Sequence, residues 1–230
     1  MNINVTNENI VQDMSKLSSK KYKEILVKRT PYRIVKRIID VILSTIGLIV
    51  LLPVFAIIAL MIKLESKGPV FFKHTRIGKN GKIIKMYKFR SMVENAEELI
   101  KNFTPEQMKE YKEYYKLSND PRITKVGKVL RKASLDELPQ LINIIKGDLS
   151  IIGPRPVIEE ELKKYRDNSE KFLSVTPGLT GNWAANGRSC TSYEHRMEME
   201  LFYVDNVSLK LDLKIFFKTI EAVISRRGAV

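Results

Sequence analysis

An uncharged run of 22 residues, Val41 to Ile62, constrains this sequence more than any other feature. At about 1.5 Å of rise per residue, a helix of this length can cross a hydrocarbon core about 30 Å thick. A buried helix of a soluble core is the alternative, but helices that are apolar on all sides over this length are uncommon in so small a domain. The sequence therefore predicts a membrane segment.

Basic residues flank this run on both sides. They are Lys28, Arg29, Arg33, Lys36 and Arg37 before it and Lys63, Lys67, Lys73 and Arg76 after it. Since Lys and Arg favour the cytoplasmic side of a membrane, both ends of the segment are expected there. Pro53 lies in the middle of the run, where it removes a backbone donor and bends a helix. These facts favour a re-entrant helical hairpin with its bend at Pro53, while a kinked span with a cytoplasmic soluble part remains open.

The net charge predicts an anionic partner but does not identify which class of anion it is. The chain carries 40 Lys and Arg against 26 Asp and Glu, a net charge of +14 that attracts nucleic acid, anionic lipids or phosphorylated substrates. Nucleic-acid binding explains the charge but not the apolar run. The turn at Gly78–Lys82 lacks the spacing of a phosphate-binding P-loop. Because the first apolar run begins only at Val41, no cleavable signal peptide is expected.

Cysteine and histidine usage limits the kinds of site. A single cysteine, Cys190, excludes an internal disulfide framework. Two histidines, His74 and His195, leave little material for a zinc site. Both observations suit a reducing compartment.

The rest of the chain predicts a small soluble region of mixed structure. Two β-prone runs flank the Asn-Gly of a short turn, which is typical of a hairpin. The expected elements are this hairpin over 69–92, a helical insertion over 93–117 with a capping box at Thr104–Gln107, a helix opened by a second capping box at Ser134–Glu137 and ending near Gly147, and an amphipathic helix over 207–227. The last has a lysine stripe and is expected either on the core or in the lipid interface.

Three long motifs carry a resemblance to a known family. They are Asn119-Asp120-Pro121-Arg122, then VGKVLRKASLDELPQLINIIKGDLSIIGPRP, then TPGLTGNWAANGR. Together they resemble the bacterial sugar transferases, which are polyprenyl-phosphate hexose-1-phosphate transferases of the monotopic phosphoglycosyl transferase superfamily. The match runs from about Arg33 to the C-terminus. Two departures are Leu52, where relatives often have Ser before the proline, and Ala184-Ala185 after Trp183, where many have Gln-Val.

The resemblance implies an α+β fold with a mainly helical, membrane-associated domain, a re-entrant N-terminal membrane helix, a small β-hairpin and interfacial amphipathic helices. The implied parts are a polar and basic tail over 1–32, the re-entrant helix over 33–63 and a cytoplasmic catalytic domain over 64–230. The protein is expected at the bacterial cell membrane, with its soluble part on the cytoplasmic face.

The resemblance also implies a reaction. The donor would be a UDP-sugar, the acceptor undecaprenyl phosphate and the cofactor Mg²⁺, with membrane lipids but no nucleic acid as partners. The transferred sugar, the pathway and a homo-oligomer are left open. A non-enzymatic membrane scaffold of a polysaccharide assembly complex is the alternative.

The expected site centres on an acidic pair. Taken alone, Asp136 and Glu137 are typical of the first turn of a helix, whose dipole favours carboxylates and would keep Asp136 ionised. By resemblance, Asp136 is the nucleophile that forms a phosphosugar ester, and Glu137 helps to hold Mg²⁺. The cations implied to bind substrate phosphates are Lys88, Arg90, Arg131, Arg155 and Arg188. Such groups offset the repulsion between an attacking anion and a phosphate.

Overall fold

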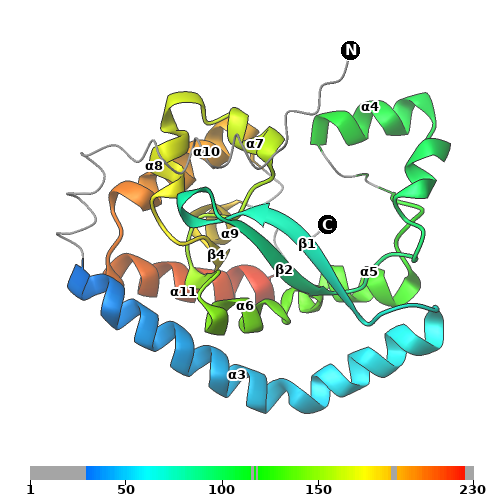
Figure 1. Ribbon diagram of the computed structural model, residues 1–230, viewed down its shortest axis with the longest axis horizontal. Helices are drawn as coiled ribbons and strands as arrows, with labels where there is room; N and C mark the ends of the chain where they lie inside the picture. The colour runs from blue at the N-terminus through cyan, green and yellow to red at the C-terminus, as the bar shows by residue number, and fades with distance from the viewer. Residues whose placement is uncertain (1–29, 115–116, 118, 188–190, 226–230) are drawn as a thin grey trace.

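The computed structural model describes residues 30–114, 117, 119–187 and 191–225 (Figure 1). Its helices are α3 (Thr30–Glu65), α4 (Pro105–Tyr114), α5 (Lys125–Lys132), α6 (Gln140–Lys146), α7 (Glu159–Lys163), α8 (Ser169–Leu173), α9 (Asn182–Asn186), α10 (Tyr193–Asp205) and α11 (Leu209–Ile224). The strands are β1 (Phe71–Ile77), β2 (Ile83–Phe89), β3 (Ser150–Ile152) and β4 (Gly178–Thr180), and short 3₁₀ turns are η1 (Lys79–Gly81), η2 (Glu98–Asn102), η3 (Leu135–Glu137) and η4 (Arg166–Asn168). This confirms a mostly helical fold with a small sheet component.

Helix α3 contains the whole predicted membrane segment. It is one helix of 36 residues that continues through Pro53, and it curves along one side of the molecule (Figure 1). Most of its large apolar side chains are exposed, such as Ile49 at 63% and Val50 at 67%. A long apolar N-terminal helix is therefore confirmed, whereas the re-entrant hairpin stays a prediction.

The soluble domain packs against both halves of α3. In the second half, Ile58 and Ile62 are buried in a cluster with Phe89 and Leu130. In the first half, Asp40 is buried and its Oδ1 accepts a hydrogen bond from the Ile151 amide at 3.0 Å. One face of α3 is thus part of the domain, and the opposite face remains apolar and uncovered.

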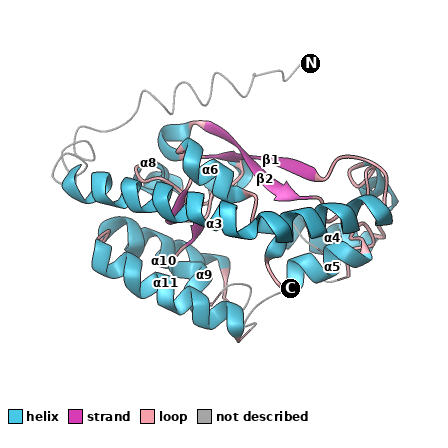
Figure 2. Ribbon diagram, turned by 90° about the horizontal axis from the view of Figure 1, so that it is seen from below, coloured by secondary structure: helices cyan, strands magenta, loops and turns pink. Residues whose placement is uncertain are grey.

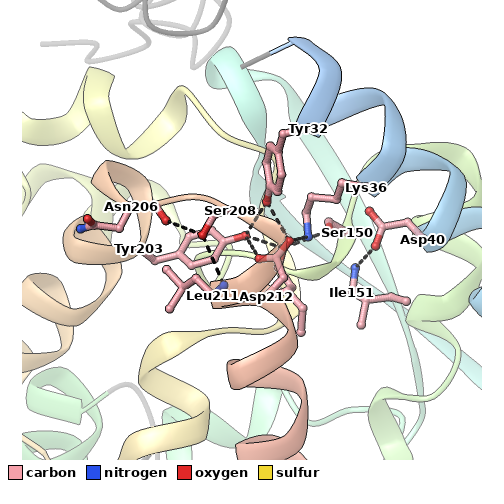
Figure 3. A network of polar contacts seen from close by, with 11 residues as sticks. Tyr32, Lys36, Asp40, Ser150, Ile151, Tyr203, Asn206, Ser208, Leu211 and Asp212 are labelled. Atoms are coloured by element: carbon pink, nitrogen blue, oxygen red, sulfur yellow. Dashed lines mark hydrogen bonds and ion pairs between the residues drawn. The ribbon is translucent and has the colours of Figure 1, made fainter. Parts of the chain in front are cut away.

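A buried carboxylate holds the start of α3 (Figure 3). Asp212 of α11 accepts hydrogen bonds from the Tyr32 hydroxyl at 2.7 Å and from the Tyr203 hydroxyl at 2.7 Å. Its Oδ2 also lies 2.8 Å from the Lys36 ammonium. Because all three donors converge on one carboxylate, this contact fixes α3, α10 and α11 relative to one another.

The end of α3 is held by groups from the hairpin and from α5. The Arg90 guanidinium donates to the backbone oxygens of Ser66 and Lys67 at 2.8 and 2.5 Å. In return, the Glu65 carboxylate accepts from the amides of Lys125 and Val126 at the start of α5, at 2.6 and 3.0 Å. A carboxylate at a helix N-terminus satisfies free amides and suits the helix dipole.

The predicted hairpin is confirmed. Strands β1 and β2 pair antiparallel from Phe71 opposite Phe89 to Ile77 opposite Ile83. Asn80 and Gly81 in the turn have φ values of 56° and 79°, a region that asparagine and glycine adopt with little strain. The other small sheet pairs β3 and β4 in parallel.

The predicted insertion is also confirmed as helical, with η2 and α4 inside it. Its capping box forms as expected, because the Gln107 amide donates to Thr104 Oγ1 at 3.2 Å and the Thr104 amide donates to Gln107 Oε1 at 3.0 Å. The Arg122 guanidinium lies against the rings of Phe103 and Tyr111, at 5.0 and 5.2 Å from their centroids. This cation–π contact ties the insertion to the domain.

Helix α11 turns its predicted apolar stripe outward. Leu213 and Phe217 are 60% and 62% exposed, whereas Asp212 and Ile215 face the core. The helix lies beside the first half of α3 in both views (Figures 1 and 2). The apolar stripe of α11 therefore does not pack on the core.

The Asp212 contact predicts an unequal response to one substitution at two sites. Lys36→Met should lower the free energy of unfolding by about 2 kcal/mol, because it leaves a largely buried carboxylate without its counter-ion, and this corresponds to a fall in Tm of roughly 6 °C. Thermal unfolding in detergent measures the change. The matched control is Lys82→Met, since Lys82 makes an ion pair of 2.9 Å with Asp148 but is 70% exposed. Equal Tm values for the two variants would contradict the anchoring role.

Candidate active site

The acidic pair lies on η3, the short turn between α5 and α6. The predicted capping box at Ser134 is wrong, because the Ser134 side chain makes no capping hydrogen bond and the residue has a left-handed φ of 56°. Its amide instead donates to the Arg131 carbonyl at 3.0 Å, so Ser134 terminates α5 rather than opening the next helix. Helix α6 starts later, at Gln140. The pair is therefore held by a tight turn between two helices.

Lys88 from the end of β2 lies between the two acids. Its ammonium is 2.6 Å from Glu137 Oε1 and 4.0 Å from Asp136 Oδ2. The Arg155 guanidinium also approaches Glu137 Oε1, at 3.8 Å. Asp136 is only 8% exposed, whereas the Arg155 side chain is 37% exposed. The site is thus a recessed aspartate with a more open guanidinium beside it.

The pKa of Asp136 is raised above its usual value, because burial outweighs the effects that lower it. Burial raises the pKa of Asp136, and the neighbouring Glu137 carboxylate raises it further. The positive charges of Lys88 and Arg131 lower this pKa, and so does an amide hydrogen bond. The expected source of ionisation was the dipole of a helix, but here two cations oppose the effect of burial. Such a carboxylate can act as a nucleophile when these cations keep it charged.

The other predicted phosphate-binding residues are distributed unevenly. Arg131 lies near Asp136 and donates from Nε to Ser91 Oγ at 2.9 Å. The Arg90 guanidinium is 7% exposed and bonds to the end of α3, as described above. Strand β2 ends at Phe89, so Arg90 does not share the alternation that places Lys88 at the site. Arg188 lies outside the described residues, and Pro53 lies within α3.

Close backbone packing positions Arg155. It follows β3 and Gly153, which contacts β4 so tightly that a Cβ on Gly178 would lie 2.1 Å from the Gly153 amide nitrogen. The Arg155 amide donates to Glu200 Oε1 at 3.1 Å, and Glu200 on α10 is 0% exposed. Only glycine allows this approach of the two strands. The loop that carries Arg155 is therefore fixed by α10 and β4 together.

Residues that the sequence analysis did not assign to the site extend its positive charge. Glu161 of α7 accepts from Arg196 of α10 at 3.0 Å and lies 3.6 Å from Arg76 of β1. The Arg155 and Arg196 guanidinium groups lie 5.9 and 4.7 Å from the Trp183 ring. The glycines of Gly-Pro-Arg-Pro and Pro-Gly-Leu-Thr-Gly could have indicated the close approach of β3 and β4, because glycine permits it. Nothing in the spacing of Arg76, Glu161 and Arg196 could have brought them together.

This neighbourhood keeps His74 neutral and selects for anions. Burial, together with the charges of Arg76, Lys88 and Arg155, lowers the pKa of His74 to about 4. Burial, together with Arg155, also lowers the pKa of Arg76, to about 10. Each cation here disfavours the charge of its neighbours, so a ligand with several negative charges would relieve their repulsion. A diphosphate has that character.

The acidic pair also suits a magnesium ion. Among the described residues no group of three or more His, Cys, Asp or Glu side chains gathers in one place. Mg²⁺ needs fewer protein ligands than this, because it is usually held by one or two carboxylates together with waters and the phosphates of the substrate. Adjacent carboxylates on Asp136 and Glu137 match that donor set, with Lys88 as the present partner of Glu137.

Comparisons with known proteins agree on one family. Residues 31–226 match the family described as bacterial sugar transferase. The chain is 46% identical over 197 residues to the exopolysaccharide production protein ExoY of Rhizobium meliloti, covering 84% of this chain and 87% of that one. It is 42% identical over 207 residues to the undecaprenyl-phosphate galactose phosphotransferase of Salmonella typhimurium, covering 89% of this chain.

A further relative in Escherichia coli is the UDP-glucose:undecaprenyl-phosphate glucose-1-phosphate transferase, which is 40% identical over 197 residues and covers 82% of this chain. The matched region makes up 43% of the Salmonella protein and 40% of the E. coli protein. This chain therefore spans less than half of those two relatives but most of ExoY.

Glu200 predicts a particular dependence of stability on pH. Burial raises the pKa of Glu200 from 4.5 to about 7, so the folded protein retains a proton that the unfolded chain releases. The contribution of this residue to stability therefore falls as pH rises from about 4.5 to about 7. Glu200→Gln should remove this loss and raise Tm relative to wild type more at pH 8 than at pH 5. Thermal unfolding at both pH values measures the effect.

The matched control for this prediction is Glu194→Gln, the same change at an exposed position of the same helix. Its Tm relative to wild type should be equal at the two pH values. A Glu200→Gln variant with the same relative Tm at both pH values would contradict a protonated Glu200.

Proposed function

This chain belongs to the bacterial sugar transferase family, and we propose that it transfers a hexose 1-phosphate from a UDP-sugar to undecaprenyl phosphate. As a member it is a phosphoglycosyl transferase enzyme. The observation that carries the reaction is the ammonium of Lys88 lying between Asp136 and Glu137, with Arg155 beside them. The names of the Salmonella and E. coli relatives, which specify galactose and glucose with undecaprenyl phosphate, support the same substrate classes. Exopolysaccharide synthesis is the process that the name of ExoY suggests.

The proposed route has two steps on one aspartate. An oxygen of the ionised Asp136 forms a bond to the β-phosphorus of the UDP-sugar, and the bond from that phosphorus to the bridging oxygen breaks, releasing UMP. The phosphate oxygen of undecaprenyl phosphate then attacks the same phosphorus. This second attack releases the Asp136 carboxylate and gives undecaprenyl-diphosphate-sugar. Splitting the transfer lets one small site use a soluble donor and a lipid acceptor in turn.

The surrounding cations have distinct tasks in this route. Lys88, bound to Glu137, opposes the rise of the Asp136 pKa and so helps to keep the nucleophile ionised. Arg155 is the more exposed of the two cations beside Asp136 and Glu137, so it is suited to bind the donor diphosphate. Its guanidinium also lies near the ring of Trp183. Glu137 would help to hold Mg²⁺, which would supply positive charge that offsets repulsion between the attacking Asp136 carboxylate and the phosphates. Planar guanidinium groups also bind phosphate oxygens in pairs.

We further infer a re-entrant arrangement of α3 in the membrane. Lys36 and Ile62 lie near opposite ends of the apolar segment, yet both contact the same soluble domain. A helix that crossed the bilayer between them would place one of these contacts on the far side. Basic residues at both flanks agree with two cytoplasmic ends. The exposed apolar residues of α3 and α11 would then lie in the lipid, with the soluble domain on the cytoplasmic face.

Replacing the proposed nucleophile should abolish the reaction without unfolding the protein. Asp136→Asn is expected to reduce UMP release by at least about 1000-fold, because an amide cannot form the phosphosugar ester. The assay uses purified protein with Mg²⁺, undecaprenyl phosphate and a set of UDP-sugars. EDTA should stop the wild-type reaction, and added Mg²⁺ should restore it.

The control is Asp148→Asn, which changes an aspartate outside the site and should retain activity. Asp136→Asn at the wild-type rate would rule out this nucleophile. A wild-type protein that releases no UMP with any donor would favour a non-enzymatic scaffold.

The re-entrant arrangement predicts that both ends of α3 are shielded from outside. Single cysteines at Arg33→Cys and Lys67→Cys, each in a Cys190→Ser background, should react with an impermeant maleimide only after spheroplasts are lysed. Lys128→Cys in the soluble domain serves as the cytoplasmic reference. Labelling of either end in intact spheroplasts would show a helix that spans the membrane.

A further inference from the structure

A cavity lies at the start of α3, apart from the acidic pair. It has a volume of about 570 Å³, and its walls come from the first turns of α3, the hairpin turn and the ends of β3, α8 and α10. These elements meet at the end of the molecule where α3 begins (Figure 1). Lys79 of this cavity and Lys88 of the acidic site lie at opposite ends of β2, whose length of seven residues corresponds to about 20 Å.

The walls of this cavity carry more positive than negative charge. They include five cations, Arg33, Lys36, Arg37, Lys79 and Lys171, and two carboxylates, Asp40 and Asp205. Three of the cations have partners: Lys36 pairs with Asp212, Lys171 pairs with Asp205, and Arg37 donates to the Ile144 and Ile145 carbonyls. Asp40 accepts the Ile151 amide. Both carboxylates of the cavity wall therefore already have partners other than Arg33 and Lys79.

The side chains of Arg33 and Lys79 make no hydrogen bond or ion pair with any residue that the structure describes. They belong to elements far apart in the sequence, yet they are close enough to interact. Burial, together with the charge of Arg33, lowers the pKa of Lys79 to about 8. Two cations that repel each other at one cavity would be stabilised by a shared anion.

The apolar surroundings indicate that this anion is attached to hydrocarbon. Ile34 and Ile38 of α3 line the same cavity and are 56% and 53% exposed. They begin the apolar face that continues along α3. Deeper in the cavity, Leu149 and Val175 add apolar surface. A phosphate between Arg33 and Lys79 would therefore have acyl chains passing directly onto the membrane-facing side of the helix.

We propose that this cavity binds the phosphate headgroup of an anionic phospholipid, with Arg33 and Lys79 as its ligands. The site is separate from the acidic pair and does not depend on the reaction proposed above. Lipid held here would join the membrane to the hairpin turn and to the start of α3. Basic cavities beside membrane helices are suited to this because the headgroup is held by charge and the chains remain in the bilayer.

The test measures lipid retention rather than catalysis. Full-length protein is reconstituted in phosphatidylcholine vesicles that contain a minor fraction of phosphatidylglycerol, then extracted in a neutral detergent, and the lipids that remain bound are counted by native mass spectrometry. Wild type should retain phosphatidylglycerol in preference to phosphatidylcholine. The double variant Arg33→Gln/Lys79→Gln should lose this preference by roughly tenfold, because it removes both cations.

The matched control removes the same charge at a distance from the cavity. Lys101→Gln/Lys109→Gln alters two exposed lysines of η2 and α4, at the opposite end of the molecule (Figure 1). This variant should retain phosphatidylglycerol as wild type does. Equal loss in both double variants would show only a diffuse attraction of a basic protein, and equal retention in all three proteins would show no site; either result overturns the proposal.

A soluble anion provides the last comparison. Inorganic phosphate is titrated into each protein in neutral detergent, and Tm is recorded. If phosphate raised the Tm of wild type but not of Arg33→Gln/Lys79→Gln, while no phosphatidylglycerol was retained, the ligand would come from solution and the lipid assignment would be overturned. The Tm without phosphate also reports whether the cavity variant is folded, so that loss of lipid is assigned to a folded protein.

Discussion

The attachment of one long apolar helix to a single domain at both of its ends is the constraint on which the rest of the structure depends. Asp212 holds the start of α3 through Lys36 and Tyr32, and Arg90 holds the backbone that follows its end. Both contacts use charged groups that are largely buried, so each is costly to break on one side only. The helix is therefore part of the fold, even though most of its surface is apolar and exposed.

This constraint also explains where the acidic pair lies. Helix α6 packs along α3, and the turn that carries Asp136 and Glu137 comes directly before α6. Strand β2 ends against the second half of α3 through Phe89, which places Lys88 beside the same turn. In the proposed reaction, this arrangement would let a lipid acceptor and a soluble donor use one site beside α3. The depth of Asp136 results from packing on the membrane helix.

Several residues near one another in sequence have separate tasks in the structure. Lys88 and Arg90 are two positions apart, but one lies at the acidic pair and the other binds the end of α3. Ser134 precedes Asp136 by two positions and closes the helix before it. The position of these side chains next to a motif does not show which way they point. The alternation of a strand stops where the strand ends, as before Arg90, and a left-handed residue such as Ser134 interrupts the helical periodicity.

The amino-acid sequence by itself determined the features that depend on local chemistry. The apolar run specified α3, the Asn-Gly pair specified the hairpin turn, and Thr104 with Gln107 specified the start of α4. Only the tertiary structure decided which cations face the acidic pair, that Glu200 is buried beneath Arg155, and that Arg33 and Lys79 line one cavity. The reason is physical: local elements follow from steric and hydrogen-bonding preferences of neighbouring residues, whereas burial and charge pairing arise between groups that only folding brings together.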